Sequence, residues 1–130
     1  MTTENQNLRV YDLEERTAIF GEETLWFVKQ VKQTDYNKNI LMQLIKAVTS
    51  VGANYMEATM AESKNDFIHK ISITCKELKE VKHWIRMLVV INPELVEKLR
   101  KTWKEAQELT LIFSKSIKTS KENENKKQKQ

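Results

Sequence analysis

The sequence predicts an all-α protein that folds as an up-down-up-down antiparallel four-helix bundle. Only two glycines and one proline occur in 130 residues, which leaves few breakpoints for a β-rich fold with many turns. Residues that favour helix, such as Leu, Lys, Glu, Gln, Ala and Met, are abundant. Four long stretches repeat apolar side chains at the helical period, and short polar breaks separate them. We therefore expect one domain with a single core.

The first helix is expected to begin near Asp12, because Glu15 three residues later forms the acidic variant of a capping box. Its apolar stripe consists of Leu13, Phe20, Phe27 and Val31. The polar break KQTDYN ends it. A second helix should then run from about residue 37 to 61, with its core stripe at Leu41, Leu44, Val48, Val51, Tyr55 and Thr59.

Two further helices follow clear start signals. Ser63 with Asp66 three residues later predicts an N-cap, and the stripe continues through Phe67, Ile71, Thr74, Leu78, Val81, Ile85 and Leu88. Asn92 is expected to cap the fourth helix, with Pro93 in the first helical position. The fourth core stripe is predicted at Leu95, Leu99, Trp103, Ala106, Leu109 and Phe113.

The charge pattern divides the chain into three parts. We expect a flexible lead over residues 1–10, the bundle over 11–118 and a disordered basic tail over 119–130. Residues 114–130 contain six Lys and two Glu, which equals the net charge of +4 of the whole chain. Residues 1–113 are therefore neutral. From Thr119 onward no apolar residue occurs, which is typical of a solvated segment that cannot bury a core.

Composition and motifs argue against several classes of function. The single Cys75 cannot form an intramolecular disulfide, and we expect it to be a packed structural thiol. Glu80 and His83 form the one Glu-x-x-His pair, but helical angles place both outward, away from a bundle core. With no phosphate loop or nucleophile constellation, we expect no enzyme, no metal and no cofactor. A polar N-terminus and no long apolar run favour a cytoplasmic protein that does not span a membrane.

The second helix has more apolar surface than one bundle can bury. Between Ile40 and Met56 its only charged residue is Lys46. A monomeric bundle should present a polar face to water on the side opposite the core. We therefore predict a homo-oligomer, although a monomer with an apolar surface is the alternative. The predicted subunit interface comprises Met42, Ala53 and Met60 of the second helix and Trp84, Met87 and Ile91 of the third.

The stretch SVGANYMEATMAE within the second helix combines small and polar residues. Gly52 predicts a close approach by a neighbouring helix, since a glycine in a helix otherwise costs about 1 kcal/mol relative to alanine. Glu77 falls within the apolar stripe of the third helix, and a buried carboxylate must be either paired with a cation or protonated; Lys70 and Arg16 are the candidate partners. The predicted buried polar network is Arg16, Asn54, Glu57, Lys70 and Glu77.

A basic ridge is predicted on the outer face of the third helix. It is formed by Lys76, Lys79, Lys82, His83 and Arg86, with Lys64 further back on the same side. Residues 63–91 contain six Lys and Arg against three acidic residues, so this helix is net positive. Such a ridge can bind nucleic-acid phosphates with little choice of sequence. An ordinary solvated helix face is the alternative interpretation.

Three segments also carry a family resemblance: YDLEERTAIFGE (11–22), TSVGANYMEATMAESKNDFIHKI (49–71) and KELKEVKHWIRML (76–88). They resemble the four-helix-bundle family first recognised as products of intervening sequences in bacterial 23S rRNA genes. The resemblance implies a homo-oligomer, with pentameric rings among relatives, and no established enzymatic activity. A related group serves as accessory proteins of diversity-generating retroelements, contacting nucleic acid and a reverse transcriptase. Two hypotheses follow: non-specific RNA or DNA binding, or a scaffold that binds a partner protein without touching nucleic acid.

Overall fold

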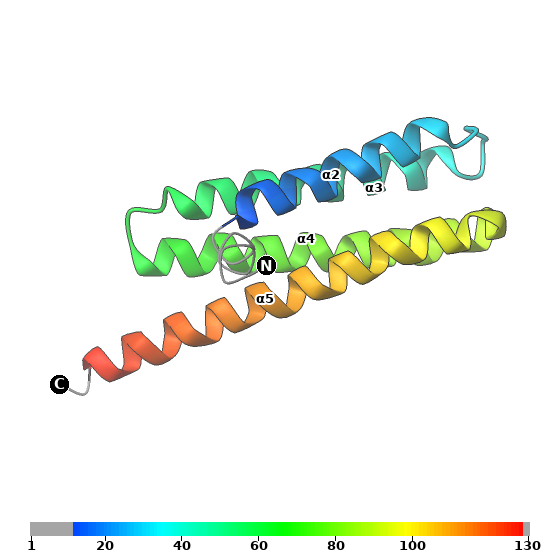
Figure 1. The fold of residues 1–130 in the computed structure, drawn as a ribbon. Coiled ribbons are helices and arrows are strands. Elements are labelled where there is room, and N and C mark those ends of the chain that lie inside the picture. The colour runs from blue at the N-terminus through cyan, green and yellow to red at the C-terminus, as the bar shows by residue number, and fades with distance from the viewer. Residues whose placement is uncertain (1–11, 129–130) are drawn as a thin grey trace, which may run out of the picture.

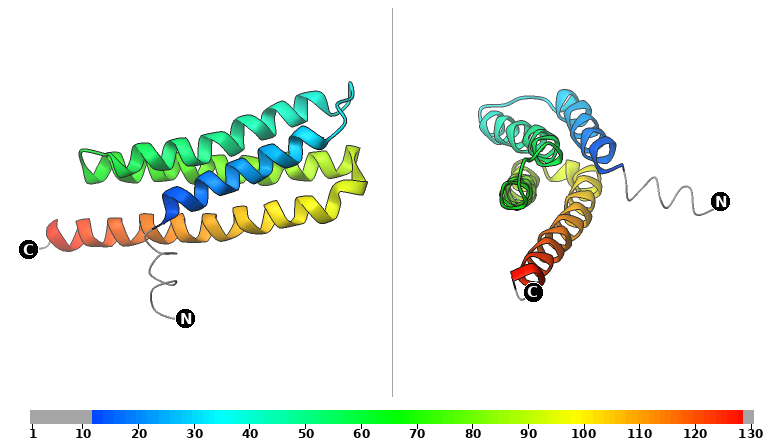
Figure 2. Two further views of the ribbon diagram at one scale, coloured as in Figure 1. Left: turned by 45° about the horizontal axis from the view of Figure 1, so that its top comes forward. Right: turned by 90° about the vertical axis from the view of Figure 1, so that its left-hand side faces the viewer.

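The computed structural model describes residues 12–128, which form four α-helices and one short 3-10 helix (Figure 1). The helices are α2 (Leu13–Gln30), α3 (Lys38–Thr59), α4 (Lys64–Ile91) and α5 (Val96–Gln128), and the 3-10 helix η1 (Pro93–Leu95) precedes α5. Successive helices run in opposite directions beside one another (Figure 2). The predicted all-α, antiparallel four-helix bundle is confirmed.

The helices α3 and α4 form the centre of the bundle. Their contact is the most extensive, and α2 packs mainly on α3 while α5 packs mainly on α4. Along α4, buried side chains recur at three- and four-residue spacing, as the predicted stripe requires. Leu44, Leu78 and Leu109 are among those with no exposed surface. Because α2 and α5 meet over a short length only, the fourth side of the bundle is less tightly closed.

The predicted core is correct for most positions and wrong for Thr59, which is exposed at the end of α3, and for Trp103, which is 41% exposed. Trp103 lines a groove between α4 and α5, whereas Leu99 before it and Ala106 after it are fully buried. In α2 the buried set also includes Thr17 and Thr24. Each threonine hydroxyl donates a hydrogen bond of 2.8 Å to the carbonyl four residues earlier, Leu13 and Phe20 respectively. That bond removes the cost of burying the hydroxyl group.

Gly52 faces α2 at Thr17, so the predicted close approach occurs between α3 and α2. A Cβ atom at position 52 would lie 3.7 Å from the Thr17 carbonyl oxygen, which is an ordinary van der Waals contact. The helices therefore leave room for one methyl group. A glycine is not sterically required there, contrary to the expectation from sequence.

Of the predicted helix caps, only Ser63 forms its side-chain bond. The Ser63 hydroxyl accepts a hydrogen bond of 3.1 Å from the Asp66 backbone N–H. Asp12 and Asn92 occupy the N-cap positions predicted for them, before α2 and before η1, but neither makes a side-chain capping bond. The Asn92 amide group donates to Glu94 and its oxygen accepts from Asn37 instead. The Asn92 side chain therefore bonds to Asn37 of the other loop and to the Glu94 side chain, and not to a backbone N–H of the first turn.

Asn37 joins the two loops at one end of the bundle. Its side chain is fully buried between the α2–α3 loop and the α4–α5 loop. The amide group donates to the Lys32 carbonyl and to Asn92 Oδ1, both at 3.0 Å, and Asn37 Oδ1 accepts from the Thr34 N–H at 2.7 Å. These bonds satisfy a polar side chain inside the protein and fix how α3 enters the bundle.

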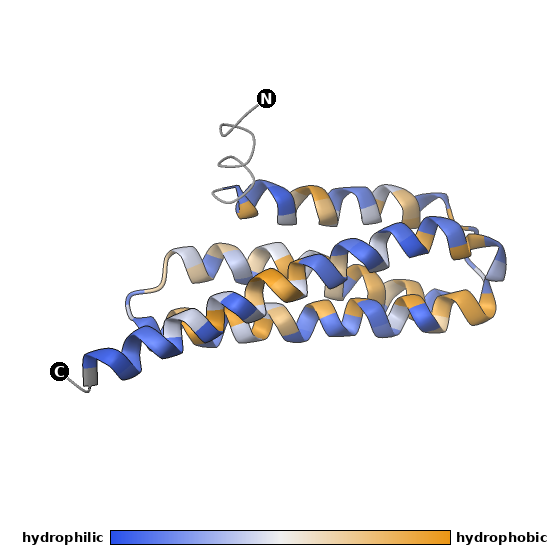
Figure 3. Ribbon diagram, turned by 60° about the horizontal axis from the view of Figure 1, so that its bottom comes forward, coloured by the Kyte–Doolittle hydropathy of each residue, from blue (hydrophilic) through white to orange (hydrophobic). Residues whose placement is uncertain are grey.

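The last helix differs from the predicted disordered tail, because α5 continues through Gln128. The residues beyond Thr119 are mostly Lys, Glu, Asn and Gln, and several of these have good helix propensity. The packed part of α5 supplies the nucleus from which helix can propagate. This end of α5 is uniformly hydrophilic and projects beyond the other helices (Figure 3). The predicted flexible lead, residues 1–10, and residues 129–130 lie outside the described residues.

Candidate nucleic-acid interface

The six residues of the predicted basic ridge are spread over two flanks of α4. Lys76, Lys79 and His83 line a shallow depression that also includes Gln43 of α3 and Trp84. The imidazole of His83 meets the Trp84 indole edge-on, with ring centroids 4.9 Å apart. This half of the predicted set therefore faces solvent on the α3 side. Lys64 is half-buried at the first residue of α4, well away from the depression.

Lys82 and Arg86 lie on the other flank, beside α5. The Lys82 ammonium donates a 2.6 Å hydrogen bond to Gln107 Oε1 and lies 5.4 Å from the centroid of the Trp103 ring. Arg86 lines a groove between α4 and α5 together with Arg100. The predicted single ridge is thus divided, and its α5 side is extended by cations that the ridge did not include.

The residues missed from sequence are Arg100, Trp103 and Lys104 of α5. All three line the α4–α5 groove beside Arg86. Arg100 lies three residues before the tryptophan, on the same face of the helix, and Lys104 is the next residue in the chain. The sequence contains these residues at this spacing, but it does not show that they line a groove. Trp103 fits the predicted core stripe, and no local signal indicates which face of α5 meets α4.

The carboxyl group of Glu77 has no cationic partner of the kind predicted. Burial raises its pKa first, and the neighbouring Glu80 carboxylate raises it further, while Lys76 and Lys46 oppose the shift. A group in this position holds its proton more firmly than an ordinary glutamate.

Arg16 pairs with α5 and not with Glu77. Its guanidinium donates to Glu105 through Nε at 3.0 Å and through Nη2 at 2.7 Å, and Nη2 also reaches Glu108 at 3.0 Å. The hydrogen bond to Glu105 is the largest cause that raises the pKa of Arg16. This forked contact is the main polar link between α2 and α5.

The remaining members of the predicted polar network form two separate contacts. The Lys70 ammonium lies 2.9 Å from the Glu57 carboxylate, and this pair links α4 to α3 at the surface. The Asn54 amide donates to the Ser50 carbonyl within α3. The five predicted residues therefore do not share one buried network; they make separate contacts, most of them at the periphery of the bundle.

The predicted interface residues on α3 are exposed in the protomer. Met42 is 64% exposed and Met60 is 77% exposed. Ala53 lines an outer groove between α2 and α3, whose floor is made of small residues such as Gly21 and Gly52. On α4 the predicted interface is less accessible, since Trp84 and Met87 are half-buried and Ile91 is 40% exposed. Self-association through these residues stays a prediction.

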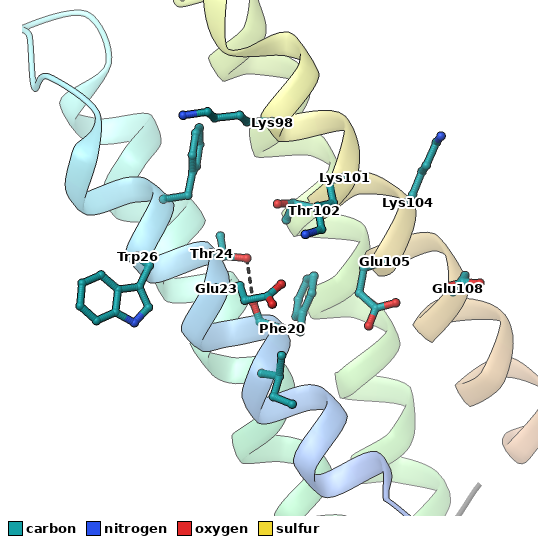
Figure 4. Close-up of a pocket in the computed structure, with 12 residues that line it drawn as sticks. Phe20, Glu23, Thr24, Trp26, Lys98, Lys101, Thr102, Lys104, Glu105 and Glu108 are labelled. Carbon is teal, nitrogen blue, oxygen red and sulfur yellow. Dashed lines mark hydrogen bonds between the residues drawn. The ribbon is translucent and has the colours of Figure 1, made fainter. Parts of the chain in front are cut away.

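A second groove lies between α2 and α5, where the two helices separate (Figure 4). Phe20 lines its α2 side, and Lys101 and Glu105 line its α5 side. The Trp26 indole extends away from α5 in this view, and the Lys29 ammonium lies 4.8 Å from its ring centroid. Charges of both signs line this groove, so it offers no uniformly positive surface.

The remaining sequence candidate, Cys75, is half-buried beside α5, with its Sγ 4.0 Å from the Ser114 hydroxyl. Burial is the main cause that raises the pKa of its thiol. Within residues 12–127, no group of three His, Cys, Asp or Glu side chains is placed to hold a metal ion. None of the described helices is both long enough and apolar enough to cross a membrane.

Fold and surface together define a small antiparallel four-helix bundle with a basic flank where α4 meets α5. The profile of the 23S rRNA-intervening sequence protein family matches residues 15–115, and the chain belongs to this family. A search among curated proteins gave no match. A Bacteroides thetaiotaomicron protein of unknown function from the S23 ribosomal protein family has a similar crystal structure, with a TM-score of 0.72 and 25% identity. The alignment covers 81% of this chain and 97% of that protein.

Proposed function

We propose that this chain is a non-enzymatic, homo-oligomeric protein that binds RNA or DNA non-specifically through the basic surface of α4 and the adjoining part of α5. The arrangement of Arg86, Arg100 and Lys104 along one groove carries the proposal. Within residues 12–127, no carboxylate lies within salt-bridge distance of Arg86 or Lys104, and Arg100 has only a 3.6 Å contact with Glu97. These cations remain available to phosphates.

Binding of this kind depends on charge and counterion release. Each phosphate neutralised by a Lys or Arg releases condensed cations, so affinity falls steeply as salt rises. Lys76 and Lys79 on the α3 side of α4 provide a second group of exposed cations. Contacts of this type fix the position of the backbone and do not discriminate between base sequences.

Self-association would bring several copies of this basic surface together in one assembly. Ala53 and the small residues near it line a groove between α2 and α3, whereas the basic groove lies between α4 and α5, so the two surfaces belong to different pairs of helices. An assembly through the α2–α3 surface would leave the basic flanks of several protomers accessible. Repetition of a weak phosphate site raises the overall affinity without new contacts.

The test is a filter-binding titration of RNA and DNA at two salt concentrations. The double variant Lys79→Glu/Arg86→Glu should abolish binding and leave the oligomer intact, because both side chains are exposed and outside the predicted interface. The matched control is Lys29→Glu/Lys38→Glu, which reverses two exposed lysines on α2 and α3. No binding at low salt, or binding that ignores salt, would contradict the proposal.

The exposed apolar surface of α3 favours a second candidate function, a scaffold that binds a partner protein without contacting nucleic acid. Both functions share a homo-oligomer, so the mass of the protein in solution is measured first. Ala53→Glu should lower the oligomeric state while helix content is kept, because Ala53 is exposed and its side chain supports no core contact. If the wild-type protein is monomeric in solution, the homo-oligomer that both candidate functions require is excluded.

A further inference from the structure

We infer that Trp103 forms a stacking site for the bases of single-stranded nucleic acid, at the groove where α4 meets α5. This inference rests on the proposed function, because it assigns a substrate class to the same basic flank. It depends on a structural observation that the charge pattern alone does not provide, namely that a large aromatic ring lies among the cations of the groove. Trp103 is 41% exposed, although its position in the sequence pattern is that of a core residue.

Lys82 of α4 lies against the indole ring of Trp103. The Lys82 ammonium lies 5.4 Å from the ring centroid, and its bond to Gln107 keeps it there. Lys82 does not line the α4–α5 groove, whereas Trp103 does. Trp103 also lines the groove and keeps 41% of its surface exposed, so part of the ring can be reached by a ligand in the groove.

The groove has the chemical character that a nucleotide requires. Its volume is about 680 Å³, and its apolar lining includes Val89, Val90 and Val96 beside the indole. Val90 is 73% exposed, so this apolar surface is not covered by the protein's own described residues. A base that stacks on Trp103 would bury one face of the ring and find apolar contacts at its edge.

The cations lie where the phosphates of such a strand would pass. Arg86 comes from α4, and Arg100 and Lys104 come from α5, on either side of Trp103 along that helix. No acidic side chain of the described residues lines the groove. An aromatic platform flanked by cations is the general solution for single strands, whose bases are unstacked and accessible. A duplex keeps its bases stacked internally and can use only the cations.

The experiment measures binding of the full chain to labelled oligothymidylate, oligouridylate and a duplex of equal length, at one low salt concentration. Trp103→Ala should weaken binding of both single strands roughly 5-fold to 150-fold, the range measured for loss of one stacked base. Duplex and inorganic polyphosphate binding should change by less than about twofold, because they depend on phosphate charge alone. Trp103→Phe should recover part of the single-strand affinity.

The matched control is Trp26→Ala, which removes an exposed tryptophan that also has a lysine beside its ring. It should leave all four affinities unchanged. A second readout uses the Trp26→Phe/Trp84→Phe variant, in which Trp103 is the only one of the chain's three tryptophans that remains. Oligothymidylate should quench its fluorescence, and polyphosphate should not.

The outcomes separate this inference from the proposed function. If the wild-type protein binds no nucleic acid, the proposed function fails and the stacking site fails with it. If binding is salt-dependent but Trp103→Ala changes single strands and duplex equally, or changes neither, only the stacking site is overturned. Fluorescence changes with anionic lipid vesicles or an acidic peptide, and none with oligonucleotides, would also overturn it.

Discussion

The two helix pairs that face each other across the bundle differ in how they are held. Between α3 and α4 the contact is continuous and apolar, with Leu44 and Leu78 fully buried. Between α2 and α5 the contact is short, and the forked ion pair of Arg16 with Glu105 and Glu108 provides its main link. Beyond that link the helices separate and leave the groove of Figure 4.

This difference indicates where the stability of the protein resides. Apolar burial between α3 and α4 should contribute more to stability than the short α2–α5 contact, because its contribution scales with the area removed from water. The helix α2 is attached mainly through α3 and should open locally at a lower free energy than α4. Four substitutions test this division, from the largest expected effect to the smallest.

Leu78→Ala should lower the free energy of unfolding by about 2–5 kcal/mol, since it leaves a cavity at the α3–α4 contact. Ile19→Ala is the matched change on α2, where the side chain is 43% exposed at the α2–α5 groove. Its cost should stay below about 1 kcal/mol. Urea unfolding followed by circular dichroism measures both. Equal losses would show that the two contacts are equivalent after all.

Arg16→Gln should cost about 1 kcal/mol, because it removes a part-buried forked ion pair and leaves Glu105 without its cation. The loss should appear as faster hydrogen exchange in α2, with little change in α4. Arg100→Gln, which disrupts an exposed 3.6 Å contact with Glu97, is the control and should have almost no effect. Uniform acceleration across all helices would contradict the division of the bundle.

Gly52→Ala should raise the free energy of unfolding by about 0.5–1 kcal/mol, because alanine favours helix and its Cβ fits against Thr17. Gly52→Leu should lower it, since the longer side chain has no space between α2 and α3. Thermal unfolding of the three proteins measures this difference. A loss of stability with alanine would mean that α2 packs on α3 more closely than the contact distance indicates.

Glu77→Gln should have the smallest effect, and it should depend on pH. The pKa of Glu77 is raised in the folded protein, chiefly by burial and then by Glu80. The folded state therefore binds more protons than the unfolded state between the ordinary carboxyl pKa and the raised one, and stability contributed by this group is lost as pH rises through that window. Glu77→Gln should thus stabilise the protein near neutral pH by less than about 1 kcal/mol.

Below the ordinary carboxyl pKa this gain should vanish, because Glu77 is then protonated in both states. Repeating the comparison in a Glu80→Gln background provides the control, since that change removes the neighbouring carboxylate and should shrink the gain. Denaturant titrations at acidic and neutral pH measure it. A gain that is the same at every pH would exclude a shifted carboxyl as its cause.

The helix pattern and the composition were sufficient to predict the fold, because apolar spacing reports a buried face wherever a helix packs on one side. Ser63 was also predictable, since a capping bond is local. The failures share a cause. Asn92, Arg16 and Trp103 each have a partner far away in the chain, and one sequence does not contain the pairing of helix faces. For the candidate site, the cations of α4 were found and the complementary residues of α5 were missed for this reason.

The length of α5 has a consequence for encounter kinetics. The eleven residues from Lys118 to Gln128 extend about 16 Å at the usual helical rise, which exceeds the Debye length of about 8 Å at physiological ionic strength. Lys126 and Lys127, in the last turn, therefore lie more than one Debye length from the start of this segment. A polyanion diffusing from that direction meets a positive rod first. For the nucleic-acid binding proposed above, the projecting turns should thus govern how often collisions lead to capture, while the residues of the groove set the lifetime of the complex.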